Sequence, residues 1–518
     1  VAMSGGLCGS EAELGADGVY PCALGSTPII LGCAEKDAHV PAARVTRTAD
    51  MLTRSGAQVH VQLYPGTQHR IYEASAARAR SLLNAERAKR RGTSPTDPYH
   101  YLFGFKAQLL SEAIPNTVPR NQRSPRFVPH GLVAECINGS PFCAPRGENL
   151  VTWFYRVHPS VASHGAFRPL PQPHLKGDFC CPGSSLTPEP VRWHCPPPPE
   201  DAAVKRDFVE SLFTLAGSGN PMSVKGLAIH TYSANKDMVN RSFYNADGDL
   251  LVVPELGVLD IRTEFGFLRV APGEIFVLPR GLKMTVTLPE GQGRGFVGEL
   301  FESTHFQLPN LGPLGSNGLA AARHFQVPTA AFEDRACPDY ELISKFGGDL
   351  HVAGLQFSPY DVVGWSGNYH PAKYDLMQFM AFGSVTWDHA DPSTHTVLTC
   401  PVVAQNSASA FDFVCFRPRW DAVTHTWRPP YWHRNMATEF NAIIKINSPY
   451  SGFAQGVHWL TPCMTAHGIS AASHNGFGGA PPDDEPRFIS SDSIWIMFET
   501  VYPMILQDQA AEVSYREV

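Results

Sequence analysis

The sequence lacks any uninterrupted apolar run long enough to cross a bilayer, which takes about 18 residues or more. We therefore expect no transmembrane helix and no membrane partner. It also lacks an excess of basic charge, because the formal net charge is -7 and the pI is near 6.3. Proteins that bind nucleic acid or an anionic lipid surface carry a strong positive patch. The charge balance thus gives no reason to expect a nucleic-acid partner.

Paired cysteine motifs are missing as well. The chain holds 12 Cys residues, but no C-x-x-C pairs with a second one, which argues against a zinc ribbon and against a disulfide framework. No basic stretch followed by an apolar stretch opens the chain, so we expect no signal peptide. Reduced thiols in a cytoplasmic protein are the simplest interpretation. The chain begins at Val1, and we expect the natural N-terminus to lie upstream.

The length and the turn-forming residues are informative in their own right. A chain of 518 residues predicts two to four domains with sizeable cores. Pro (45) and Gly (44) are both abundant, which disfavours a helical bundle and suits short strands joined by turns. We therefore predict a mainly β protein.

Residues 1–92 follow a different pattern. A short apolar strand at 29–32, helical spacing over 45–52 and alternation over 59–63 predict a strand, a helix and a strand. The stretch resembles the C-terminal part of an α/β-hydrolase of the carboxylesterase/phospholipase group. In that resemblance Asp37 and His69 are the acid and base of a triad. No G-x-S-x-G occurs in the chain, and a base and acid without a nucleophile perform no acyl transfer. We interpret residues 1–92 as a truncated segment with a vestigial triad.

Residues 99–377 contain short segments separated by turn residues, which predict many strands. Between residues 273 and 281 the sequence has the pattern G-x5-P-x-G, with Gly273, Pro279 and Gly281. Such glycines turn the chain at both ends of a strand, and the proline ends its ladder. The pattern resembles the cupin family and implies an antiparallel jelly roll. A cupin would have a His ligand where Met284 stands, so we expect this barrel to be structural.

The stretch from His433 to His467 contains the candidate chemistry. Two imidazoles and one carboxylate, from His433, Glu439 and His467, are a donor set that suits iron(II) and leaves positions open for O2 and substrate. Residues 433 and 439 would diverge on a helix, whereas on a strand alternate residues share one face. The flanking sequence favours neither state, so the spacing alone only suggests a metal site.

Longer motifs lead into this stretch at residues 306–313, 411–414, 416–420 and 428–435. From about residue 99 to about residue 499 the chain resembles the homogentisate 1,2-dioxygenase family. The resemblance implies iron(II) at His433, Glu439 and His467 in a C-terminal domain of residues 378–518. It implies that His389 is the acid/base group, and that Tyr450 binds the substrate carboxylate with His467 beside the substrate. Homogentisate and O2 would be the substrates, and a trimer or hexamer the assembly.

The loop between Tyr450 and His467 departs from the family pattern, because a Gly-rich stretch is replaced by residues 451–458. Within it, His458 can be either a substrate contact or a loop residue. The departure leaves a second hypothesis open, that the chain is a cupin-type binding protein that no longer turns over. A third hypothesis, a carboxylesterase-like hydrolase, would need a nucleophile from missing upstream sequence.

Overall fold

The computed structural model describes most of the chain. The described residues are 2–4, 28–34, 42–54, 58–64, 97–180, 186–194, 204–309, 319–381, 384–385, 395–402, 409–423, 432–446, 453–468, 487–489 and 493–512. They form two compact units, residues 1–96 and residues 97–518. None of the described helices is both long and apolar enough to cross a membrane.

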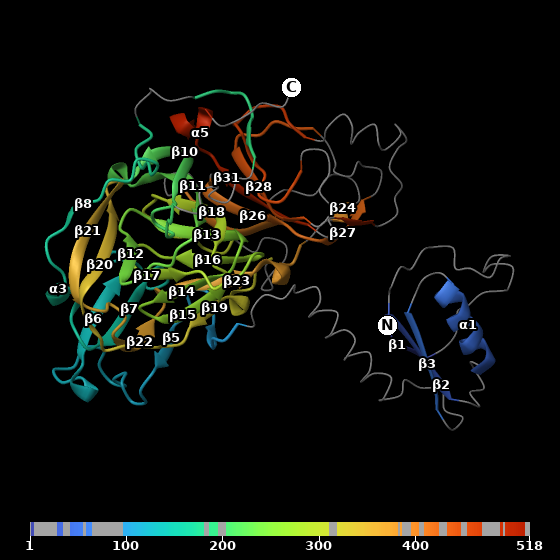
Figure 1. The fold of residues 1–518 in the computed structure, drawn as a ribbon, viewed down its shortest axis with the longest axis horizontal. Coiled ribbons are helices and arrows are strands. Elements are labelled where there is room, and N and C mark those ends of the chain that lie inside the picture. The colour runs from blue at the N-terminus through green and yellow to red at the C-terminus, as the bar shows by residue number, and fades with distance from the viewer. Residues whose placement is uncertain are drawn as a thin grey trace. The chain divides into compact units, whose positions relative to one another are not determined.

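The first unit contains a parallel sheet in the order β1-β2-β3 and one helix (Figure 1). Its elements are β1 Ala2–Ser4, β2 Pro28–Ala34, α1 Ala42–Arg54 and β3 Gln58–Tyr64. The helix contacts β2 and β3 through the apolar residues Val45, Ala49 and Leu52, which recur at helical spacing and are buried. The predicted strand, helix and strand are thus confirmed. Asp37 and His69 lie outside the described residues.

The second unit consists mainly of antiparallel sheets, which confirms the prediction of a mainly β protein. Its middle layer is a nine-stranded sheet in the order β32-β10-β11-β18-β13-β16-β23-β19-β4. These strands are β4 Tyr101–Phe103, β10 Phe213–Asn220, β11 Lys225–Ala234, β13 Asp249–Leu256, β16 Glu274–Leu278, β18 Gly293–Leu300, β19 Gln326–Pro328, β23 Ala372–Asp375 and β32 Ile505–Leu506.

One face of this middle sheet lies against a seven-stranded sheet in the order β15-β14-β17-β12-β20-β21-β8. The seven strands are β8 Arg168–Pro169, β12 Arg241–Asn245, β14 Leu259–Thr263, β15 Gly266–Val270, β17 Met284–Thr287, β20 Ala336–Phe346 and β21 Asp349–Phe357. Buried charges join the two layers: Lys345 on β20 donates to Glu299 on β18 over 2.8 Å. Figure 1 shows β20 and β21 at one side of this unit and β18 nearer its centre.

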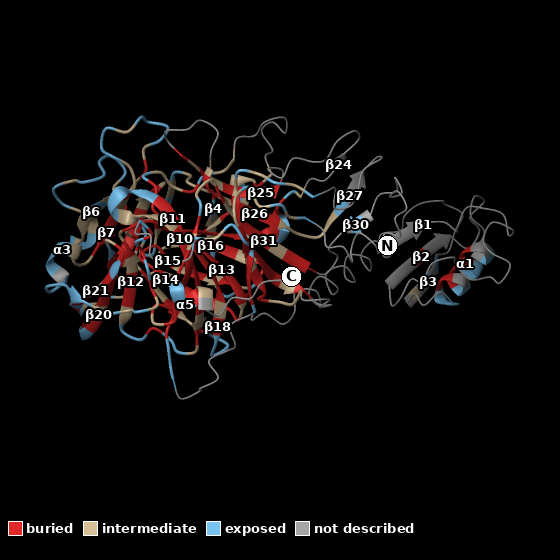
Figure 2. Cartoon of the chain, turned by 90° about the horizontal axis from the view of Figure 1, so that it is seen from above, coloured by how far each residue is buried: buried red, intermediate tan, exposed pale blue. Residues whose placement is uncertain are grey.

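The opposite face of the middle sheet contacts a six-stranded sheet in the order β25-β26-β31-β28-β29-β9. The six strands are β9 Val191–Trp193, β25 Thr396–Pro401, β26 Ser409–Phe416, β28 Thr438–Ile446, β29 His458–Thr461 and β31 Ser493–Thr500. Phe296 on β18 meets Phe440 on β28 with ring centroids 5.7 Å apart, and Gly298 faces Phe411 on β26. These aromatic residues are buried, and Figure 2 colours β18, β26 and β31 largely as buried.

Two smaller sheets and short helices complete the described part of this unit. The first sheet has the order β5-β22-β7-β6 and the second β24-β27-β30. Their bounds are β5 Leu109–Glu112, β6 Val133–Asn138, β7 Val151–Arg156, β22 Val362–Gly367, β24 Ser384–Val385, β27 Arg419–Val423 and β30 Arg487–Ile489. The helices are η1 Pro129–Gly131, α3 Ser160–Ser163, η2 Pro221–Ser223, η4 Ala322–His324, η5 Leu376–Gln378 and α5 Asp508–Glu512.

The G-x5-P-x-G stretch has the predicted form. Strand β16 runs between Gly273 and Gly281, whose φ angles of 95° and 81° lie in the left-handed region that glycine adopts without strain. Met284 begins β17 and is fully buried in the core.

Strands from the early part of the second unit pair with strands from its late part. Trp193 on β9 pairs with His458 on β29, and Leu506 on β32 pairs with Ala216 on β10. The sheet that carries β28 therefore includes a strand from far upstream.

Candidate metal centre

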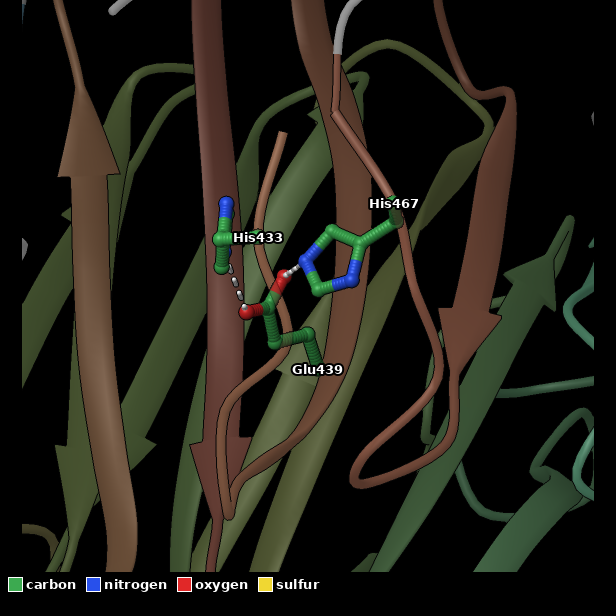
Figure 3. Close-up of side chains that lie close together, drawn as sticks. All are labelled: His433, Glu439 and His467. Atoms are coloured by element: carbon green, nitrogen blue, oxygen red, sulfur yellow. Dashed lines mark ion pairs between the residues drawn. The ribbon is translucent and has the colours of Figure 1, made fainter. Parts of the chain in front are cut away.

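Three side chains predicted from the sequence meet at the start of strand β28 in the six-stranded sheet. One ligand atom from each of His433, Glu439 and His467 lies within 4.8 Å of the other two. The Nε2 atom of His467 is 3.2 Å from Oε2 of Glu439, and Nε2 of His433 is 3.8 Å from Oε1. Figure 3 shows both imidazoles turned toward the carboxylate.

Backbone pairing between two distant segments brings the two histidines together. His433 and His467 form an isolated antiparallel bridge, in which each N–H donates to the other's carbonyl over 2.9 and 3.0 Å. Their ring centroids are 4.3 Å apart. Glu439 is the second residue of β28. The alternation considered above does not account for the site, because residues 434–437 form no strand and the chain bends at 436–437.

The turn before His467 is fixed by hydrogen bonds to Asn435 and to Thr438, the first residue of β28. The Met464 N–H donates to the Asn435 carbonyl over 2.8 Å, and Met464 has a left-handed φ of 60°. The Cys463 N–H donates to the hydroxyl of Thr438 over 3.3 Å. These contacts hold the His467 segment beside the strand that carries Glu439.

The charges within the site stabilise one another. Burial raises the pKa of Glu439, but His467, Asn435 and His433 outweigh it and hold the pKa below its ordinary value. The Glu439 carboxylate in turn raises the pKa of His467. Glu439 is buried and both histidines are partly exposed, but the Nε2 atom of His467 that faces Glu439 is itself shielded from solvent.

The donor set fits a divalent metal ion. Nδ1 of His467 lies 2.8 Å from the Thr465 carbonyl, which can only accept, so Nδ1 carries the proton of the neutral ring. Nε2 then presents a lone pair to Oε2 of Glu439, which is also an acceptor. Two acceptors at this distance need a cation or a second proton between them, and a carbonyl on the far nitrogen is the usual support of a metal-bound histidine.

The other residues predicted for the site do not lie at this cluster in the described structure. His389 and Tyr450 lie outside the described residues. His458, for which a substrate contact and a loop position were both open, is a core residue of β29. It is 1% exposed and packs against Trp193, Phe296 and Phe440, and burial lowers its pKa to about 4. Asn435, whose amide contacts Glu439, was not singled out from the sequence.

Comparison with known proteins decides the family. The model "Homogentisate 1,2-dioxygenase N-terminal" matches residues 100–376, and "Homogentisate 1,2-dioxygenase C-terminal" matches residues 377–517. The chain belongs to the homogentisate 1,2-dioxygenase family. The homogentisate 1,2-dioxygenase of Oryza sativa subsp. japonica is 45% identical over 79% of this chain and 87% of that relative. That of Drosophila melanogaster is 46% identical over 78% and 91%.

The segment ahead of the homogentisate 1,2-dioxygenase match is similar to another family. The model of the dienelactone hydrolase family matches residues 22–94, which agrees with the expected hydrolase fragment. Among solved structures, the cupin 2 conserved barrel domain protein from Leptotrichia buccalis covers 59% of this chain and 92% of its own, at 7% identity and a TM-score of 0.22. That likeness is too weak to carry an argument about function.

Proposed function

We propose that this chain is an iron(II)-dependent homogentisate 1,2-dioxygenase. It would open the ring of homogentisate with O2 to give maleylacetoacetate, a step in tyrosine and phenylalanine breakdown. The observation that carries the proposal is the approach of His433, Glu439 and His467 in a chain of this family. Two imidazoles and one carboxylate on one side of a metal are the donor set of non-haem iron oxygenases.

His433, Glu439 and His467 would hold the metal. Bound iron(II) would supply open positions for O2 and the substrate oxygens and a route for electron density from the ring to O2. We propose that Tyr450, with His467 nearby, orients the substrate through its carboxylate. His389 would accept the proton of a ring hydroxyl, a role that suits a side chain whose pKa lies near neutrality. Both atoms of O2 end in the ring-opened product.

We also propose how the chain is divided. Residues 1–92 would be a hydrolase-derived segment, residues 99–377 a structural cupin-like domain and residues 378–518 the iron-binding domain. The assembly would be a trimer or hexamer in the cytoplasm. Analytical ultracentrifugation of the full chain tests the assembly, and a monomer at micromolar concentration would contradict it.

Iron retention and oxygen uptake test the function separately. The full-length protein reconstituted with Fe(II) should retain one iron per chain and consume O2 on addition of homogentisate. His433→Ala should lose both properties, because only one imidazole and one carboxylate remain. His164→Ala, an exposed histidine in a different part of the second unit, is the matched control and should behave as the wild type.

The outcomes discriminate between the hypotheses. Iron bound at one per chain by His433→Ala would show that the ligand assignment is wrong. A wild-type protein that binds iron but consumes no O2 at saturating homogentisate would be a binding protein with an intact site, and the dioxygenase proposal would fail.

A further inference from the structure

Asn435 makes three contacts that connect the two segments of the candidate metal centre. Its Nδ2 donates to Oε1 of Glu439 over 2.8 Å. Its Oδ1 accepts the N–H of Ala437 over 3.1 Å, and its carbonyl accepts the N–H of Met464 over 2.8 Å. The local turn therefore fixes the amide oxygen of Asn435, and the amide N–H points to the carboxylate of Glu439.

The two side-chain contacts assign the orientation of the amide. The Ala437 N–H requires an acceptor, so Oδ1 faces it, and the Glu439 carboxylate requires a donor, so Nδ2 faces it. Turning the amide around would place two donors together and two acceptors together. Asn435 thus has one orientation that satisfies both neighbours.

The two oxygens of Glu439 consequently have different surroundings. Oε1 accepts the hydrogen bond of Asn435 and lies 3.8 Å from Nε2 of His433, while Oε2 faces Nε2 of His467 at 3.2 Å. We propose that Asn435 is a positioning residue that reserves Oε1 of Glu439 and leaves Oε2 as the oxygen for the metal. The inference rests on the proposed metal centre and adds a role for a residue that is not a ligand.

The role has a chemical reason. A carboxylate that ligates through both oxygens takes two coordination positions, and one that ligates through a single oxygen takes one. An N–H bonded to Oε1 competes with the metal for that oxygen. The position that is saved stays open for O2 or substrate, which is what a site with three protein ligands needs. Partners that orient ligands in this way typically change metal affinity by about 10–100-fold when removed.

Two variants separate the hydrogen bond from Asn435 to Glu439 from the local turn that Asn435 makes with Ala437. Asn435→Ala removes both side-chain contacts. Asn435→Ser removes the donor to Glu439, but its hydroxyl still accepts the N–H two residues ahead, as serine does in turns. Thr438→Val is the matched control, because Thr438 ties the same turn through the Cys463 N–H and has no hydrogen bond to Glu439 among the described contacts.

Cobalt(II) titration of the full-length protein reports the site without turnover. We expect wild type and Thr438→Val to show the same visible absorption with bound Co(II), because Thr438 does not contact the Glu439 carboxylate. In Asn435→Ala and Asn435→Ser both oxygens of Glu439 should ligate cobalt, because no amide N–H competes for Oε1. Their absorption bands should therefore weaken, because cobalt absorbs less intensely as its coordination number rises.

The possible results distinguish failure of the metal-centre proposal from failure of the role given to Asn435. Wild-type protein that binds no cobalt would refute the metal centre itself. A wild-type cobalt spectrum in Asn435→Ser would overturn the positioning role of Asn435. The same weakening of the cobalt bands in Thr438→Val would assign the effect to the turn and overturn the positioning role too.

Discussion

Replacing Lys345 with methionine tests how the buried charges between the seven- and nine-stranded sheets are balanced. Lys345 has a side chain that is 2% exposed, and its Nζ donates to Asp247 and to Glu299, each over 2.8 Å. Methionine fills a similar volume but carries no charge, so both carboxylates would stay buried without this cation. Breaking a buried pair from one side costs about 3–5 kcal/mol. We expect the free energy of unfolding of Lys345→Met to fall by that amount.

Urea denaturation followed by tryptophan fluorescence measures the difference. Lys236→Met is the control, because Lys236 pairs with Glu210 at 3.4 Å and the two side chains are 44% and 36% exposed. Such a surface pair contributes less than about 1 kcal/mol. The added change Glu299→Gln should recover part of the loss in Lys345→Met, since it removes one uncompensated charge. A Lys345→Met protein as stable as the control would refute the charge-pairing argument.

The same layer and its neighbour yield two further predictions. Lys345 and His230 lower the pKa of Glu299 from 4.5 to about 2, against the effect of burial. The stability that the Glu299 carboxylate contributes is therefore complete above pH 4.5 and is lost as the pH falls toward 2. Acid titration of the wild type should show a loss of folding stability in that window, and Glu299→Gln should lack it. Gly298→Ala should lower the free energy of unfolding by about 1–3 kcal/mol, because the added methyl meets the Phe411 ring. Gly354→Ala, whose methyl meets no atom within 4 Å, is the matched control; equal effects would contradict the packing argument.

Local patterns carried much of the fold prediction. Helix α1 follows from the spacing of Val45, Ala49 and Leu52, and strand β16 follows from Gly273 and Gly281, because each pattern acts over a few residues. The order of the strands within the sheets depends on pairing between distant segments. Nothing in residues 191–193 indicates that this short strand joins the sheet of β28.

The candidate site also combines features that local sequence predicts with contacts that depend on the fold. The residue types of His433, Glu439 and His467 pointed to a metal, but the bridge that joins the two histidines is a contact between distant segments. The bend after His433 was not apparent from the spacing either. Asn435 could have been noticed as a polar residue between two proposed ligands, but its hydrogen bond to Glu439 depends on side-chain geometry.

The pairing of β9 with β29 has a consequence for how the chain is made. A ribosome releases Trp193 long before His458, so the edge of β9 has no partner while the intervening strands are synthesised. Strand β32 joins the nine-stranded sheet beside β10 only after residues 505–506 have been synthesised. Strands β9 and β10 therefore wait for partners that are synthesised much later. A chain cut short before β29 would leave strand edges exposed to aggregation.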